Sequence, residues 1–142
     1  MTVNAAVQTA KIVLDTNIVL DVFVFNDTTI EPVRQALGNQ TLDWIATHAM
    51  RVELVRVLTY SKIAARLQFY TLSIQDVLAR FDQHARLVDA APRASVICSD
   101  PDDQMFIDLA VQQKCLLLSK DRDVLAMRKR LIAQGIRAQA AL

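Results

Sequence analysis

Glycine is scarce in this chain, whose 142 residues include only Gly38 and Gly135. The scarcity excludes a G-x-x-x-x-G-K-[ST] phosphate loop, a G-x-G-x-x-G dinucleotide turn and a G-x-S-x-G nucleophile elbow, because each of these needs clustered glycines. The chain also has only two histidines and two cysteines. They lie too far apart for H-E-x-x-H or paired C-x-x-C zinc binding. Nucleotide loops, zinc sites and serine hydrolases of these types are therefore not expected.

Long apolar runs are missing as well. No apolar stretch reaches the length of a membrane span, because Asp15 and Asp21 interrupt the longest candidate. The segment Met1–Ala10 contains no Lys or Arg and is not expected to be a secretory signal. Cys98 and Cys115 do not make a disulfide framework. We therefore expect a reduced, cytoplasmic protein with no membrane partner.

The composition that remains is that of a folded protein rich in aspartate. Hydrophobic residues make up 53% and charged residues 22% of the chain, which indicates a globular protein. The length and the lack of a linker or repeat predict one domain over residues 1–142. Thirteen of the fifteen acidic residues are Asp, so we expect any chemistry to depend on aspartate. The net charge of +1 is too small to steer a charged partner toward the protein by long-range electrostatics.

Short apolar runs alternate with helical patterns along the chain. This alternation predicts an α/β fold with a parallel sheet. Strands are predicted at 11–15, 41–47 and 115–119, with short apolar pieces at 87–88 and 96–97 and a last edge strand at 136–138. Helices are predicted at 18–25, 32–37, 48–60 (continuing loosely to 67), 73–85, 101–114 and 121–134, with a strand as the alternative for 18–25.

Two aspartates follow predicted buried strands. Asp15 ends the first strand, and Asp121 comes two residues after the strand at 115–119. Parallel strands place their carboxyl ends on one edge of the sheet, where ligands bind in open α/β folds, so these two acids can converge. Each also has a plainer interpretation as a helix-capping residue.

A further acidic cluster, Asp100-Pro-Asp-Asp103, precedes the helix at 101–114. Aspartate at the cap, proline at the first position and acids in the first turn are typical of any stable helix start. However, Asp103 lies on the stripe of Phe106 and Ile107, and Asp102 lies near it. Periodicity alone does not choose between the two acids.

Glu53 is predicted to lie in a helix among apolar neighbours, with only Arg56 charged nearby. Burying an unpaired carboxylate is costly, so Glu53 needs a partner or a raised pKa. The partner is either Arg56 or a bound cation. Together these acids describe a carboxylate pocket, and with no Cys or His cluster its cation would be Mg²⁺ or Mn²⁺.

Four segments in order resemble the motifs of PIN domains, and most closely the VapC-like toxins of toxin–antitoxin systems. The four are Val13-Leu-Asp-Thr-Asn-Ile-Val19, Glu53-Leu-Val-Arg-Val-Leu58, Asp100-Pro-Asp-Asp-Gln-Met-Phe-Ile-Asp-Leu-Ala110 and Leu117-Leu-Ser-Lys-Asp-Arg-Asp-Val-Leu125. The resemblance implies a three-layer α/β/α sandwich with a central, mostly parallel sheet. It also implies a metal-dependent endoribonuclease that cleaves RNA.

Carried over by position, the catalytic acids of the family fall on four residues of this chain: Asp15, Glu53, Asp103 and Asp121. The resemblance implies that Asp15, Asp103 and Asp121 hold Mg²⁺ or Mn²⁺, which decides for Asp103 over Asp102. Asn17 would orient the first Asp, and Ser119 stands where Thr is more usual.

The same resemblance implies partners for this chain. They are an RNA substrate, a cognate antitoxin protein that blocks the acidic pocket, and a second copy in a homodimer or higher homo-oligomer. RNA would approach over Lys120, Arg122 and the basic run Arg128–Arg130, a run that is otherwise a solvated helix face.

Two other functions are open at this point. The chain could be a non-catalytic domain of the same fold that binds a partner. It could also be a phosphatase similar to the haloacid dehalogenases, which place an Asp after the first strand. That chemistry typically needs a second Asp two residues on, where this chain has Asn17, so the phosphatase is disfavoured.

Overall fold

A five-stranded sheet forms the centre of the protein in the computed structural model, which describes residues 9–142. The strands are β1 (Ala10–Leu14), β2 (Leu42–Ala46), β3 (Arg86–Leu87), β4 (Leu116–Leu118) and β5 (Ala138–Gln139). Their order in the sheet is β3-β2-β1-β4-β5, and every pairing is parallel. The predicted α/β class is therefore confirmed.

Helices connect the strands. They are α1 (Thr16–Leu20), a π-helical turn (Asp21–Phe25), a 3₁₀ turn (Thr28–Ile30), α2 (Glu31–Gly38), α3 (His48–Leu58), α4 (Ser61–Phe69), α5 (Ile74–His84), a second 3₁₀ turn (Pro101–Asp103), α6 (Gln104–Gln113), α7 (Arg122–Leu125) and α8 (Arg128–Ala133). Within the described residues, none of these helices is long and apolar enough to cross a membrane.

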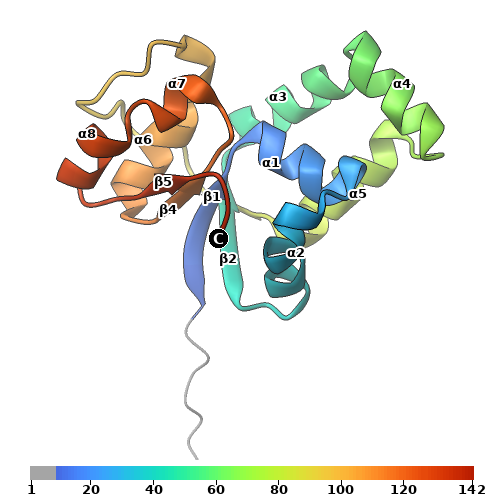
Figure 1. Ribbon diagram of the computed structural model, residues 1–142, viewed down its shortest axis with the longest axis horizontal. Helices are drawn as coiled ribbons and strands as arrows, with labels where there is room; N and C mark the ends of the chain where they lie inside the picture. The colour runs from blue at the N-terminus through green and yellow to red at the C-terminus, as the bar shows by residue number, and fades with distance from the viewer. Residues whose placement is uncertain (1–8) are drawn as a thin grey trace, which may run out of the picture.

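Helices cover both faces of the sheet (Figure 1). In the view of Figure 1, α1, α2 and α5 lie on one side of β1 and β2, and α6, α7 and α8 lie on the other. Right-handed crossovers explain this division: the chain moves outward from β1 to β3, then crosses back to β4 and β5, so its helices change face. The three-layer arrangement agrees with the expected sandwich.

The register of the central strands brings their carboxyl ends together. Ile12, Val13 and Leu14 of β1 are almost fully buried, as strands covered on both faces require. Leu14 pairs with Leu118 of β4, so the residues that follow these two strands become neighbours at one edge of the sheet. This edge is the place where Asp15 and Asp121 were predicted to meet.

Local capping follows the sequence closely at α5. The Ser73 hydroxyl accepts from the Asp76 N–H at 3.0 Å, and the Asp76 carboxylate accepts from the Ser73 N–H at 2.8 Å. This reciprocal pair satisfies two N–H groups that a helix start leaves without partners. The helix predicted at 73–85 thus begins with a capping box at Ser73.

Several predicted elements differ in the structure. The segment at 48–67 forms two helices, because Tyr60 adopts an extended conformation between α3 and α4. The segment at 121–134 is also divided, at Met127, although Val124, Met127 and Leu131 keep one buried stripe. The last strand begins at Ala138, two residues later than the start of the predicted edge strand. The apolar piece at 96–97 forms no strand.

Candidate metal centre

Three aspartates gather at the carboxyl edge of the sheet. Asp15, Asp103 and Asp121 each offer a carboxylate oxygen, and these oxygens lie within 4.8 Å of one another. Asp15 follows β1, Asp103 closes the 3₁₀ turn before α6, and Asp121 precedes α7. The structure therefore brings together three of the four acids that the sequence singled out.

The sheet itself holds Asp15 in place. Its N–H donates to the Leu118 carbonyl at 2.9 Å, which continues the ladder between β1 and β4 by one step. One carboxylate oxygen accepts from the Thr16 N–H at 2.7 Å, so Asp15 also caps α1. The other oxygen accepts from the Ser119 hydroxyl at 2.6 Å. Asp15 is only 4% exposed, and each oxygen has a fixed donor.

Ser119 joins two of the acids. Its hydroxyl donates to Asp15 and accepts from the Asp121 N–H at 3.0 Å. The Ser119 side chain is fully buried, and its hydroxyl has both of these partners. Asp121 in turn accepts from the Asp123 N–H at 2.8 Å and so caps α7. Asp121 therefore both caps α7 and belongs to the acidic cluster.

Asp103 differs from the other two in having a buried oxygen without a partner. Its backbone N–H donates to the Asp100 carbonyl at 3.1 Å within the 3₁₀ turn. The side chain is buried, and among the described residues its Oδ2 accepts no hydrogen bond. Asp102 is exposed instead. Burial therefore selects Asp103 as the acid that faces the cluster, which periodicity did not decide.

Burial and mutual repulsion disfavour the charged forms of these acids. Burial raises the pKa of Asp15 to about 6, and the charges of Asp121 and Glu53 add to this, while the bonds from Ser119 and Thr16 oppose it. Burial likewise raises the pKa of Asp103 to about 8, with the charges of Asp15 and Asp121 adding to the effect. A site with no cation is thus electrostatically unfavourable near neutral pH.

Glu53 stands beside the cluster, and the structure does not place it within the three-aspartate group. The Thr16 hydroxyl donates to its Oε2 at 2.7 Å, and Arg56 lies 3.4 Å from its Oε1. Of the two partners considered for Glu53, the structure shows the pair with Arg56. The charge of Glu53 also contributes to the raised pKa of Asp15. Its partner Thr16 was not foreseen, because a hydroxyl donor carries no signal in the hydropathy pattern.

Comparison with known proteins adds the family. Residues 11–123 match the PIN domain family, a range that includes all four acids. The chain belongs to the PIN-domain family. Among solved structures it is similar to a PilT N-terminus domain protein from the hyperthermophilic archaeon Sulfolobus solfataricus, with 15% identity, 92% of this chain and 87% of that chain covered, and a TM-score of 0.42. No curated protein matches the sequence.

PIN domains are generally metal-dependent nucleases, and the acidic cluster of this PIN domain fits a divalent cation. The buried Oδ2 of Asp103 has no other partner among the described residues, and a buried carboxylate oxygen needs one. Carboxylate oxygens are also the donors that hard divalent cations prefer. The donor set and the unsatisfied oxygen therefore agree with the family.

A second acidic group overlaps the first. Carboxylate oxygens of Asp100, Asp103 and Asp123 also lie within 4.8 Å of one another. Asp123 is exposed, and Asp100 also caps the 3₁₀ turn through the Asp102 N–H at 3.0 Å. Sequence reasoning left the roles of Asp100 and Asp123 open, because acids at a helix start have a sufficient explanation as caps.

The loop between β4 and α7 is tied to the helix that follows β1. Lys120 donates its backbone N–H to Asn17 Oδ1 at 3.3 Å, and its ammonium pairs with the carboxylate of Asp21. Asp21 is only 4% exposed. Asn17 was expected to orient Asp15, but its side-chain oxygen accepts a hydrogen bond from this loop. Lys120 was expected to face RNA, yet its charge has this buried partner.

Proposed function

We propose that this PIN domain is a Mg²⁺- or Mn²⁺-dependent endoribonuclease that hydrolyses phosphodiester bonds of RNA. The observation that supports it most is the unsatisfied Oδ2 of Asp103 within the group of three buried or half-buried aspartates. The sequence contains no glycine-rich phosphate loop, no H-E-x-x-H or paired C-x-x-C zinc motif and no G-x-S-x-G nucleophile elbow. RNA is the substrate that the family resemblance suggests.

Asp15, Asp103 and Asp121 would hold the cation in this proposal. A bound divalent cation supplies Lewis-acid stabilisation of phosphate charge and a water that ionises near neutral pH. The residues of the chain provide the rest: Ser119 fixes the carboxylate of Asp15, the turn at Pro101–Asp103 fixes Asp103, and both must be ionised to accept the ion. Glu53, held by Thr16, would position the attacking water.

The test is a cleavage assay on structured and unstructured RNA with Mg²⁺ or Mn²⁺. Asp15→Asn and Asp103→Asn should each lower the rate by on the order of a hundredfold or more, because removing a ligand should cost at least as much as removing a supporting residue. Asp89→Asn makes the same chemical change at an exposed acid in a loop and should keep the wild-type rate. RNA cleavage that persists in both variants would contradict a catalytic role for the acidic cluster. Phosphomonoester hydrolysis without RNA cleavage would favour a phosphatase.

The biological role that we propose is that of the toxin of a toxin–antitoxin pair, acting in the cytoplasm as a homodimer or higher homo-oligomer. An antitoxin would block the acidic pocket. Exposed apolar side chains on α3 and α4 are available to protein partners: Val52 is 53% exposed and Phe69 is 76% exposed. Induced expression in a bacterium should arrest growth, Asp103→Asn should abolish the arrest, and the product of a short neighbouring reading frame should relieve it. Growth arrest by the Asp103→Asn variant would contradict a toxin that acts through cleavage.

A further inference from the structure

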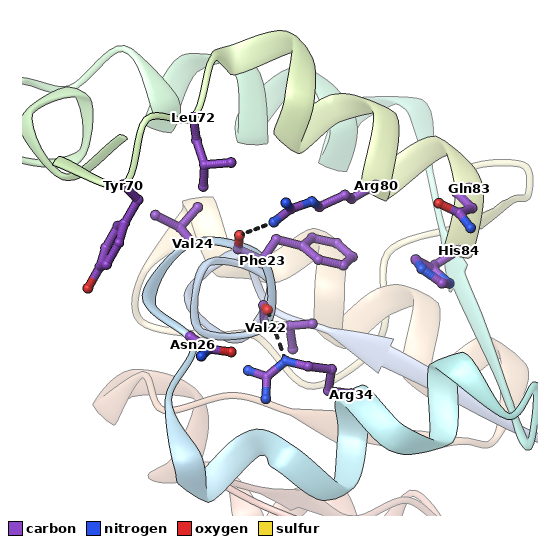
Figure 2. A pocket seen from close by; sticks show the side chains of 10 residues that line it. All are labelled: Val22, Phe23, Val24, Asn26, Arg34, Tyr70, Leu72, Arg80, Gln83 and His84. Carbon is purple, nitrogen blue, oxygen red and sulfur yellow. Dashed lines mark hydrogen bonds between the residues drawn. The ribbon is translucent and has the colours of Figure 1, made fainter. Parts of the chain in front are cut away.

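A cavity of about 540 Å³ lies apart from the acidic centre (Figure 2). Its walls are the π-helical turn Asp21–Phe25, α2, α5 and the loop between α4 and α5. None of the three clustered aspartates lines it. The π-helical turn continues α1, so the cavity lies toward the far end of the helical segment that starts beside Asp15. The π-helix is a rare conformation that is frequent at functional sites.

Two arginines reach the end of this turn from different helices. Arg80 of α5 donates Nη1 to the Phe23 carbonyl at 2.8 Å, and Arg34 of α2 donates Nε to the Val22 carbonyl at 3.3 Å. Figure 2 shows the two side chains approaching the turn from opposite sides of the cavity. These bonds satisfy carbonyls at the end of the helix, and they also hold two guanidinium groups at one cavity.

The positive charge in this cavity is incompletely balanced. Among the described residues, no carboxylate lines the cavity. Arg34 pairs with Glu31, whereas no acidic group of the described chain lies within 4.0 Å of the Arg80 guanidinium. Asp76 of the same helix interacts with Arg80 only at longer range. The bond to Phe23 uses one of the five N–H donors of Arg80, which leaves the others for a ligand.

We propose that this cavity, which we call the Arg34–Arg80 pocket, binds the phosphate of a nucleotide, supplied either by a free nucleotide or by an RNA strand. Arginine presents a planar fork that matches phosphate oxygens. Tyr70 and His84 add rings on which a base can stack, and Asn26 and Gln83 add amides that can bond a base edge. The volume is in the range of small-ligand pockets.

The rings and amides favour a nucleotide over the carboxylates of an acidic peptide. A carboxylate would use the guanidinium groups alone, whereas a nucleotide also uses Tyr70, His84 and the two amides. The proposal goes beyond cleavage at the acidic centre, because binding in this pocket needs no metal ion. Its failure and the failure of the proposed nuclease function are therefore separate results.

The experiment measures binding to the full chain in EDTA, which prevents metal-dependent cleavage. The probes are a nucleoside 5′-monophosphate, inorganic phosphate, a short single-stranded RNA and an oligoglutamate peptide. Arg80→Gln should weaken nucleotide or RNA binding tenfold or more. Arg93→Gln removes one exposed arginine elsewhere, with the same change of charge, and should change it less than twofold.

The pattern across the probes identifies the source of the phosphate. Binding of the free monophosphate that depends on Arg80 indicates a nucleotide ligand, and binding of RNA alone with the same dependence indicates an RNA strand. Equal losses in Arg80→Gln and Arg93→Gln would overturn the proposal, as would oligoglutamate or inorganic phosphate binding better than either nucleotide probe. If Arg80→Gln does not fold, NMR shifts of Tyr70 and His84 in the wild-type chain decide. Shifts confined to other residues during the titration would contradict the pocket.

Discussion

At the scale of single residues, the buried hydroxyl of Ser119 is the main support of the acidic centre. It donates to Asp15 and accepts from the backbone of Asp121, so one side chain fixes the relation between two strand ends. A donor to a carboxylate stabilises its ionised form. The bond from Ser119 therefore lowers the pKa of Asp15, against the stronger effect of burial.

Ser119→Ala should raise the pKa of Asp15 and move the pH dependence of metal binding to higher pH. The physical reason is that the Asp15 carboxylate loses its 2.6 Å donor but stays buried. The measurement is Mn²⁺ affinity as a function of pH, followed by titration calorimetry. Ser119→Thr is the matched control, because it keeps the hydroxyl, and it should keep the wild-type profile. An unchanged profile in Ser119→Ala would show that the bond does not tune Asp15.

Residue identity alone indicated which acids to examine, but not their surroundings. Asp15 and Asp121 could be placed from the sequence, because each follows a buried apolar run. Asp103 could be chosen over Asp102 only through the family resemblance, since helical periodicity places both acids near the same stripe. The contact of Thr16 with Glu53 joins residues 37 positions apart, and no local pattern carries that information.

At the scale of elements, the pair of Asp21 and Lys120 connects the helical segment after β1 to the loop that carries Asp121. Asp21 lies in the π-helical turn and is nearly inaccessible, whereas the Lys120 side chain is 43% exposed. The pair therefore brings a cation over a carboxylate that has little contact with water. This connection positions the loop without touching the proposed metal ligands' carboxylates.

Lys120→Met should destabilise the fold by about 3 kcal/mol, because it leaves the buried Asp21 carboxylate uncompensated. This figure is the lower end of the range for buried pairs, since Lys120 is partly exposed. Urea unfolding measures it. The double variant Asp21→Leu with Lys120→Met should recover most of the loss.

A surface pair provides the control for that measurement. Arg51 and Asp82 lie 2.8 Å apart, and the Asp82 side chain is 52% exposed. Arg51→Met should cost about 1 kcal/mol or less, as is usual for exposed pairs. Equal losses of unfolding free energy in Lys120→Met and Arg51→Met would mean that burial of Asp21 does not make its pair with Lys120 more stabilising than a surface pair.

Element types were predictable from the sequence, but their interruptions were not. The order of strands and helices follows from apolar runs and caps such as Ser73 with Asp76. The break between α3 and α4 lies at Tyr60, and the break before α8 lies at Met127, where no Gly or Pro marks a boundary. The π-helical turn was also unforeseen, because its carbonyls are satisfied by Arg34 and Arg80 from distant helices.

At the scale of the whole molecule, the acidic centre couples folding to pH and to metal. Asp15 and Asp103 have pKa values above that of an unfolded aspartate, so the folded chain holds more protons than the unfolded chain between about pH 4 and pH 8. The stability that Asp15 and Asp103 contribute is complete below the pKa of an unfolded aspartate. It is lost as the pH rises through their pKa values in the folded chain. For Asp15 alone, the change from 3.8 to about 6 amounts to at most about 3 kcal/mol.

Other acids set the lower limit of this window. The pKa of Asp43 is lowered by its bond from Arg86, and that of Asp76 by its bonds from Ser73. Their contribution is present above the unfolded pKa and is lost as the pH falls through the lower folded value. Measurements between pH 5 and pH 9 therefore report the acidic centre with these carboxylates ionised.

We expect the metal-free protein to melt at a lower temperature at pH 8 than at pH 5, and Mn²⁺ to reduce this difference. Ionised carboxylates bind the cation, so its stabilisation grows with pH and reaches about 2.7 kcal/mol at a concentration of 100 Kd. Asp103→Asn removes a titrating buried acid with little change of shape, so it should melt higher than wild type at pH 8 without metal and gain little from Mn²⁺. Asp89→Asn should follow the wild type in both conditions. Two results together would contradict this view: a metal-free melting temperature that rises from pH 5 to pH 8, and an Asp103→Asn variant that melts like the wild type. They would show that the clustered aspartates do not destabilise the metal-free fold by their charge.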